Sequence, residues 1–188
     1  MVTLVVTRRL LSVVGASFAG MEFLQVDRGV LDDVVEFLVG EEWPFHVEPR
    51  LDAARVRERA AGGAYDHAFW IADGADRLGM VRLMSLDDGA PLFDLRLRAA
   101  SRGRGVGTEA VRWLTAHVFT NYRTNRIEAN TRQDNHAMRR VFVKAGYVKE
   151  AHYREGWPSA DHMYDAVGYA VLRRDWENGT TTEVNWAD

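Results

Sequence analysis

The stretch LFDLRLRAASRGRGVGTE, residues 92–109, decides how this sequence is interpreted. Residues 92–97 are typical of a strand, and the glycine-rich turn GRGVG at residues 103–107 leads directly into an amphipathic helical pattern. Glycine permits positive φ and close approach of a ligand to the backbone, and the first turn of a helix presents unpaired amides at the positive end of its dipole. A phosphate or diphosphate would suit this turn, and Arg102 and Arg104 add charge and donors.

The sequence argues against two other phosphate-binding motifs and leaves one structural alternative. It is not a Walker loop, because the Gly-Lys-Ser/Thr ending is absent, and it does not follow the first strand of a parallel unit as a dinucleotide fingerprint does. For the isolated motif, a tight loop with solvated arginines stays open as the alternative.

The rest of the sequence predicts an α/β (α+β) domain with a mixed central sheet of about seven strands and helices on both faces. A length of 188 residues suits one domain, expected at residues 21–176, with an N-terminal extension or arm at 1–20 and a tail at 177–188. Strand patterns occupy 22–26, 68–72, 78–86, 92–97, 126–131, 147–153 and 163–172, and helical patterns 31–39, 52–61, 105–119 and 135–144.

Composition excludes several classes of protein. The formal net charge of −3 argues against a generally basic nucleic-acid binder, and an RNA-binding role for the Arg-Gly turn is poorly supported. The absence of cysteine excludes disulfides, cysteine zinc sites and thiol nucleophiles. The six histidines show no metal-ligand spacing, so we expect no metal.

Two motifs resemble the GNAT acetyltransferase superfamily. Arg102-x-x-Gly105-x-Gly107 resembles its Arg/Gln-x-x-Gly-x-Gly/Ala pyrophosphate signature, placed after a strand and before a helix. The segment NHAMRRVFVKAGY, residues 135–147, resembles the helix of that family that opens with Asn and closes with Lys-x-Gly-Phe. Residues 153–176 are similar to the ending of the ribosomal-protein N-terminal acetyltransferase branch, and the resemblance covers most of the chain.

The resemblance implies that acetyl-CoA is the cosubstrate and lies in a cleft where two neighbouring parallel strands splay apart, here 92–97 and 126–131. The pantetheine arm would add to the first strand through backbone groups, and the pyrophosphate would sit on amides of the turn. The implied cofactor residues are Leu95, Arg96, Leu97, Arg102, Gly103, Arg104, Gly105, Val106, Gly107, Thr108 and Asn135.

The implied reaction is direct attack of an amine on the thioester with both substrates bound. A base must take a proton because only a neutral amine is nucleophilic. We expect Asp94 to be that base, since its spacing from Arg102 resembles the arrangement in some aminoglycoside 6′-N-acetyltransferases. Alternatively, Asp94 pairs with Arg96 or Arg98 or faces water. A backbone amide near Leu95 would hold the oxyanion.

The sequence departs from the family where a proton donor for the leaving thiolate is expected. Many members carry a Tyr seven residues after the helix-opening Asn, and this chain has Phe142 there. The N-terminal acetyltransferase branch often has a Ser three residues after that Asn, and this chain has Met138. Water, or else His136, Tyr153 or Tyr122, is left to help the thiolate depart.

The acceptor pocket is expected from the first helices and the loop at residues 41–46. Acidic groups with aromatic walls would suit a cationic amine. Alternatively, the aromatic residues belong to the core and the glutamates are solvated. The expected acceptor residues are Glu42, Trp43, Phe45, His46 and Trp157.

Together these features predict a cytoplasmic N-acetyltransferase acting on a peptide N-terminus or a small amine, without nucleic-acid or membrane partners. An aminoglycoside-type enzyme and a non-catalytic acyl-CoA-binding module stay open as alternatives. Residues 1–20 contain two arginines before a short apolar run, but a cytosolic cofactor favours an arm or strand over a twin-arginine export signal. Sheet edges near the final strands make a homodimer plausible.

Overall fold

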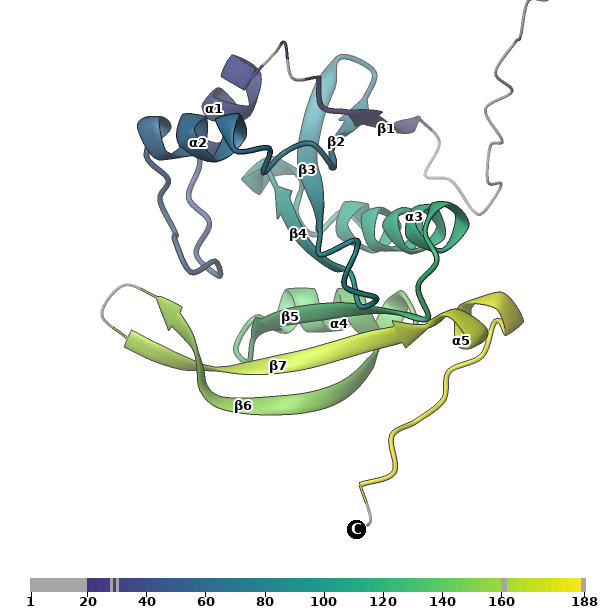
Figure 1. Cartoon of the computed structure of the whole chain (residues 1–188). Coiled ribbons are helices and arrows are strands. Elements are labelled where there is room, and N and C mark those ends of the chain that lie inside the picture. Colours follow the sequence, from purple (N-terminus) through teal and green to yellow (C-terminus); the bar gives the residue numbers. More distant parts are fainter. Residues whose placement is uncertain (1–19, 28, 30, 160–161, 187–188) are drawn as a thin grey trace, which may run out of the picture.

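A computed structural model describes residues 20–27, 29, 31–159 and 162–186 (Figure 1), so nearly all of the predicted N-terminal extension lies outside the described residues. Every predicted strand and helix is found, and an additional short helix, α5, crosses the expected start of the tail. The elements are β1 (Met21–Gln25), α1 (Leu31–Val39), α2 (Ala53–Ala61), β2 (Ala68–Asp73), β3 (Asp76–Met84), β4 (Leu92–Leu97), the 3-10 turn η2 (Ala99–Ser101), α3 (Val106–Asn121), β5 (Arg126–Arg132), α4 (His136–Lys144), β6 (Val148–Ser159), β7 (His162–Leu172) and α5 (Arg173–Asn178).

The strands form two sheets, which refines the expectation of one mixed sheet. The first has the order β1-β2-β3-β4 and the second β5-β7-β6, and every pairing within them is antiparallel. A backbone hydrogen bond of 2.8 Å from Glu128 N to Pro91 O joins them beside the start of β4. Beyond that point the sheets diverge, as Figure 1 shows, so the predicted splay lies between β4 and β5.

Helices cover both faces of the first sheet, as the sequence predicts. On β2, Ala68 and Trp70 pack in one cluster with residues of α1 and α2, whereas Phe69 and Ile71 pack in clusters with residues of α3. Alternate strand residues face opposite sides of a sheet, so β2 is buried on both faces. The same rule places Asp94 and Arg96 on one face of β4 and Leu95 on the other.

Local sequence fixes where the helices begin. The Asp52 carboxylate accepts a hydrogen bond from the Arg55 amide, and the Asn135 side chain accepts one from the Met138 amide, so each caps its helix. Helix α3 instead begins after Gly105, whose φ of 88° lies in the left-handed region. This start leaves the first amides of α3 without a side-chain cap.

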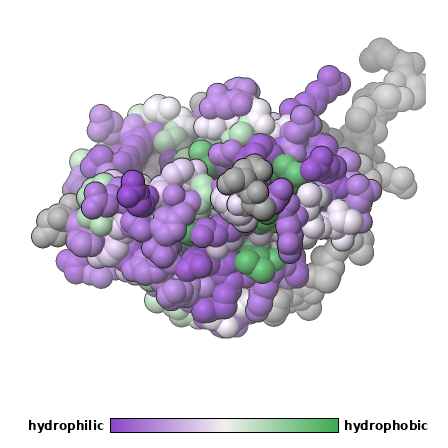
Figure 2. Space-filling model, turned by 90° about the horizontal axis from the view of Figure 1, so that it is seen from below, coloured by the Kyte–Doolittle hydropathy of each residue, from purple (hydrophilic) through white to green (hydrophobic). Residues whose placement is uncertain are grey.

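The face on the side of β6 is largely hydrophilic, with hydrophobic residues in separate spots (Figure 2). Tyr153 on β6 and Met163 on β7 are among the large exposed hydrophobic residues. The homodimer stays a prediction, because scattered exposed apolar residues are normal for a monomer. Within the described ranges, no helix is long and apolar enough to cross a bilayer.

Candidate functional site

The glycine turn presents backbone amides that donate a hydrogen bond to no group in the described part of the chain. Gly103 and Gly105 have φ values of 73° and 88°, which open the turn at the start of α3. The amides of Thr108 and Glu109 already donate to the Gly105 carbonyl. The five amides of residues 103–107 have no such acceptor, and consecutive free amides at a helix start form an anion-binding nest.

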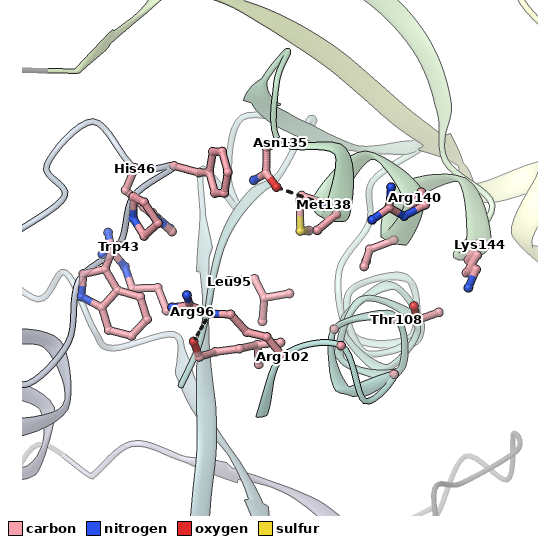
Figure 3. A pocket seen from close by; sticks show the side chains of 18 residues that line it. Trp43, His46, Leu95, Arg96, Arg102, Thr108, Asn135, Met138, Arg140 and Lys144 are labelled. Atoms are coloured by element: carbon pink, nitrogen blue, oxygen red, sulfur yellow. Dashed lines mark hydrogen bonds between the residues drawn. The ribbon is translucent and has the colours of Figure 1, made fainter. Parts of the chain in front are cut away.

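A cavity of about 380 Å³ opens in front of this turn. Its walls come from β4, the turn, α4 and the loop between α1 and α2, and Figure 3 shows Trp43, His46 and Arg96 at one end with Arg140 and Lys144 towards the other. The lining residues are Trp43, Pro44, Phe45, His46, Leu95, Arg96, Leu97, Arg102, Gly103, Gly105, Gly107, Thr108, Asn135, Ala137, Met138, Arg140, Val141 and Lys144.

The cavity gathers most of the residues predicted to hold the cofactor. Two of them lie elsewhere: Val106 is 6% exposed in the core beneath the turn, and Arg104 is exposed outside the lining. Of the predicted acceptor residues, Glu42 and Trp157 also lie outside the lining. Asp94 does not line the cavity either, although Arg96, on the same face of β4, does.

Two residues expected to bind the cofactor through their side chains are engaged within the protein. The Arg102 guanidinium donates to the carbonyl oxygens of Leu97 at 3.0 Å and Glu42 at 3.4 Å. The side-chain oxygen of Asn135 accepts a hydrogen bond from the Met138 backbone amide, and its side-chain nitrogen donates one to the Thr131 hydroxyl at 3.1 Å. Main-chain groups therefore dominate the free polar surface of the turn.

Asp94 lies in a cluster of positive and hydrogen-bonding groups. One carboxylate oxygen is 3.0 Å from His46 Nε2, and the other is 3.1 Å from Arg96 Nε and 3.7 Å from an Arg82 nitrogen. Burial raises the pKa of the Asp94 carboxyl, but the hydrogen bond from His46 and the charges of Arg96 and Arg82 outweigh burial and hold that pKa well below its usual range. Asp94 is thus a weak proton acceptor, and the alternative of an Asp94–Arg96 pair is what the geometry shows.

The loop that carries His46 is anchored at several points. Trp43 Nε1 donates to the Leu38 carbonyl at 2.8 Å, and Arg132 donates to the Pro44 carbonyl at 3.0 Å. Trp43 is 1% exposed, so it belongs to the core and also forms part of the cavity wall. These contacts hold the loop beside β4.

The glutamates of this loop pair with nearby arginines. Glu41 accepts from the Ala99 amide at 2.8 Å and lies 3.6 Å from Arg98, and Glu42 pairs with Arg50. In the described part of the chain, the lining of this cavity includes no Asp or Glu. Nearby arginines pair with both carboxylates, which agrees with the alternative that the glutamates lie outside the pocket, and the acceptor residues stay a prediction.

None of the candidate acids lines the cavity. Phe142 is 1% exposed in the core, and Met138, at the position where the related branch has Ser, contributes a thioether to the wall. His136, Tyr122 and Tyr153 lie outside the lining.

Sequence reasoning missed two cationic residues of the wall, Arg140 and Lys144 of α4. They follow Ala137 at spacings of three and seven, which place them on the same side of a helix, so helical periodicity counted from the helix start could have found them. Within the described ranges, no group of His, Asp and Glu could hold a metal.

Comparison with known proteins agrees with this geometry. A family model described as an acetyltransferase (GNAT) domain matches residues 31–148. The Bacillus subtilis protein YdaF, by its name a candidate ribosomal N-acetyltransferase, is 29% identical over 101 residues. That match covers 53% of this chain and 55% of YdaF, so the chain matches about half the length of this relative.

Solved structures share the fold at low sequence identity. Spermidine N-acetyltransferase from Vibrio cholerae, solved with CoA and spermine, has a TM-score of 0.72 at 16% identity and matches over 85% of this chain and 99% of its own. RimL, a ribosomal L7/L12 α-N-protein acetyltransferase solved with coenzyme A, has a TM-score of 0.72 at 15% identity, over 82% of this chain and 94% of its own.

Proposed function

Because this chain belongs to the GNAT acetyltransferase family, we propose that it is an acetyl-CoA-dependent N-acetyltransferase whose acceptor is the α-amine of a peptide or a small monoamine. Membership of the family confirms the resemblance found in the sequence. The proposal rests on the backbone amides of residues 103–107, which have no hydrogen-bond acceptor in the described part of the chain. They face a cavity lined by β4 and α4.

The diphosphate of acetyl-CoA would accept hydrogen bonds from these amides, at the positive end of the α3 dipole. Arg140 and Lys144 would add positive charge from the facing wall. The acetyl-pantetheine arm would run along β4, whose edge at Leu95 and Leu97 lies away from β3 and towards the gap between the sheets. Backbone groups would therefore make most of the cofactor contacts.

In the proposed reaction, the neutral amine nitrogen uses its lone pair to form a bond with the thioester carbonyl carbon. The carbonyl electrons move to oxygen, where a backbone amide near Leu95 would stabilise the charge. When the carbonyl re-forms, the C–S bond breaks and its electron pair leaves with sulfur. The amine's proton goes to a base, and the CoA thiolate takes a proton from water, since His136, Tyr122 and Tyr153 lie outside the lining.

The charge of the cavity supports this class of acceptor over a polyamine or an aminoglycoside. Its ionisable lining residues besides His46 are Arg96, Arg102, Arg140 and Lys144, and no carboxylate is among them. A polycation would have to enter this surface without a compensating negative charge, which is unfavourable in a partly desolvated site. The aromatic walls from Trp43 and Phe45 suit an uncharged portion of the acceptor.

A thiol-release assay with acetyl-CoA and three groups of acceptors tests the proposal. We expect peptides with free N-termini or simple monoamines to release CoA, and spermine and aminoglycosides to be poor acceptors. Preferred release with spermine or an aminoglycoside would contradict the acceptor class. Tight acetyl-CoA binding without release for any amine would favour the non-catalytic acyl-CoA-binding module.

A further inference from the structure

We propose that His46 takes the proton from the acceptor amine and that Asp94 is a positioning residue that fixes the tautomer of the His46 ring. The inference deepens the proposed function and rests on it. It assigns the proton transfer to a cavity residue that the sequence marked only as part of the acceptor pocket.

The geometry of the pair defines which ring nitrogen is free. His46 Nε2 lies 3.0 Å from Asp94 Oδ1, and an ionised carboxylate can only accept a hydrogen bond, so Nε2 carries the proton. In the neutral ring, the lone pair is then on Nδ1. Among the residues that the structure describes, Nδ1 is buried and has no hydrogen-bond partner, and a buried polar atom of this kind is costly unless a donor arrives.

The position of His46 in the cavity suits proton transfer. The side chain is 25% exposed and lines the same cavity as Leu95, the residue that follows Asp94 in β4. The hydrogen bond to Asp94 therefore holds the ring close to the strand along which the thioester would lie. Trp43 contacts the ring edge-on, with centroids 6.2 Å apart, and helps fix its orientation.

Asp94 is less suited to take the proton itself. Both of its oxygens already lie near cationic or donor groups from His46, Arg96 and Arg82, and the residue lies outside the cavity lining. Imidazole gains and loses a proton near neutral pH, which is why histidine serves most often as a general base. The pair thus combines a shielded carboxylate with a ring that lines the cavity and has one nitrogen unpaired within the described residues.

The charged groups that surround the ring come from three strands. Asp94 and Arg96 lie on β4, and Arg82 faces Asp94 from β3. Arg132 of β5 holds the loop through the Pro44 carbonyl. In the proposed step, Nδ1 takes a proton from the ammonium form of the acceptor, which frees the nitrogen lone pair to attack the thioester carbonyl carbon, and Asp94 stabilises the resulting imidazolium. The proton that the nitrogen loses as the amide forms passes to water, and the CoA thiolate takes one from water. Water then removes the imidazolium proton after CoA has left.

The kinetic test uses His46→Gln, because glutamine can keep a hydrogen bond to Asp94 but cannot act as a base. His152→Gln is the matched control, since His152 and Asp165 form a second His–Asp pair, 2.7 Å apart, outside the cavity lining. At pH 7 we expect turnover of His46→Gln to fall about 100-fold, with the acetyl-CoA KM nearly unchanged. His152→Gln should keep wild-type turnover.

The pH dependence separates proton transfer from a structural role of the loop. A peptide α-amine has a pKa of about 7.7–8.0, so it is mostly neutral at pH 9.5 and depends less on a base. We expect the deficit of His46→Gln to shrink to less than about tenfold there. A deficit that stays the same from pH 7 to pH 9.5, or one below about threefold at pH 7, would overturn the proposal.

A nitrogen-15 NMR measurement of the histidine rings with CoA bound gives a readout that needs no acceptor. We expect the neutral His46 ring to carry its proton on Nε2, and Asp94→Asn to allow the other tautomer because an amide can donate to Nε2. A wild-type ring protonated on Nδ1 alone would overturn the dyad. If wild-type protein acetylates no amine, the proposed function fails, and the ring signal still decides the geometry.

Discussion

Arg102 Nε donates a hydrogen bond to the Leu97 carbonyl oxygen, 3.0 Å away, so the arginine of the glycine turn reaches back to the end of β4. A second nitrogen of the same guanidinium donates to Glu42 and lies 3.9 Å from the Glu41 carboxylate. The residue that the sequence motif associates with pyrophosphate therefore links the turn to the loop after α1. The Arg102 side chain thus has a structural role, and the proposed binding of the diphosphate falls to the backbone amides of the turn.

We expect Arg102→Met to lower the free energy of unfolding by about 1 kcal/mol through the loss of these hydrogen bonds. The acetyl-CoA Kd should rise less than about tenfold, because amides carry the diphosphate in the proposed complex. Urea unfolding and calorimetric titration measure the two effects, and Arg123→Met, an exposed cation outside the cavity lining, is the control. A Kd raised 30-fold or more without a loss of stability would show that the guanidinium itself binds the phosphates.

Gly105→Val should abolish measurable acetyl-CoA binding. The residue has a φ of 88° before the first turn of α3, where a β-branched side chain is strained and would cover the adjacent amides. Gly74→Val is the matched control, because Gly74 has a φ of 57° in the turn between β2 and β3, away from the cavity. Both variants should lose stability by roughly 1–2 kcal/mol, and only Gly105→Val should lose binding in calorimetry. Equal binding by both would contradict the role of the turn.

The sequence predicted the strands, the helices and the glycine turn because each is set by local pattern. A continuous apolar run marks β2 and alternation marks β4, and the Gly105 start of α3 follows from glycine's access to positive φ. The division into two antiparallel sheets was not predicted, since it depends on which strand edges meet. A hydrogen bond from Glu128 to Pro91 marks that junction, and nothing in either local sequence signals it.

The site was predicted less completely because charge pairing is set by tertiary contacts. Arg82 faces Asp94 across β3 and β4, twelve positions apart in the sequence, through the register of the sheet. His46 reaches Asp94 from a loop 48 residues away. The prediction of Asp94 as base stays open to experiment, but these contacts favour His46 in that role.

Acid should weaken the fold through Asp94. Its pKa is depressed in the folded protein by the His46 hydrogen bond and by Arg96 and Arg82, which outweigh the opposing effect of burial. The contribution to stability is therefore complete above the unfolded-state pKa of about 3.9 and is lost as pH falls towards the folded value. Asp94→Asn should cost about 3 kcal/mol at pH 7 because it leaves the two guanidinium groups without their anion.

Urea unfolding of wild type and Asp94→Asn at pH 7, 5 and 3 measures this linkage. The difference between the two proteins should be smaller at pH 3 than at pH 5. A difference that grows from pH 5 to pH 3 would mean that Asp94 is protonated more easily in the folded protein than in the unfolded chain, contrary to the contacts described.

Phe142→Tyr should not restore an acid to the reaction. The Phe142 ring is 1% exposed and lies among Phe93, Tyr147 and Tyr169, with ring centroids 5.0–6.1 Å away. A hydroxyl added there would be buried without an assured partner, so we expect the free energy of unfolding to fall by about 1–3 kcal/mol and turnover not to rise.

Met138→Ser is the variant to compare with Phe142→Tyr. Met138 lines the cavity, so its replacement places a hydroxyl beside the proposed path of the thiolate. If proton donation to sulfur limits the rate, turnover should rise in Met138→Ser and not in Phe142→Tyr. If thiolate departure is already fast, neither variant should exceed wild type. A rise in turnover for Phe142→Tyr alone would show that this ring can reach the reaction centre, and the burial of Phe142 would then not describe the working enzyme.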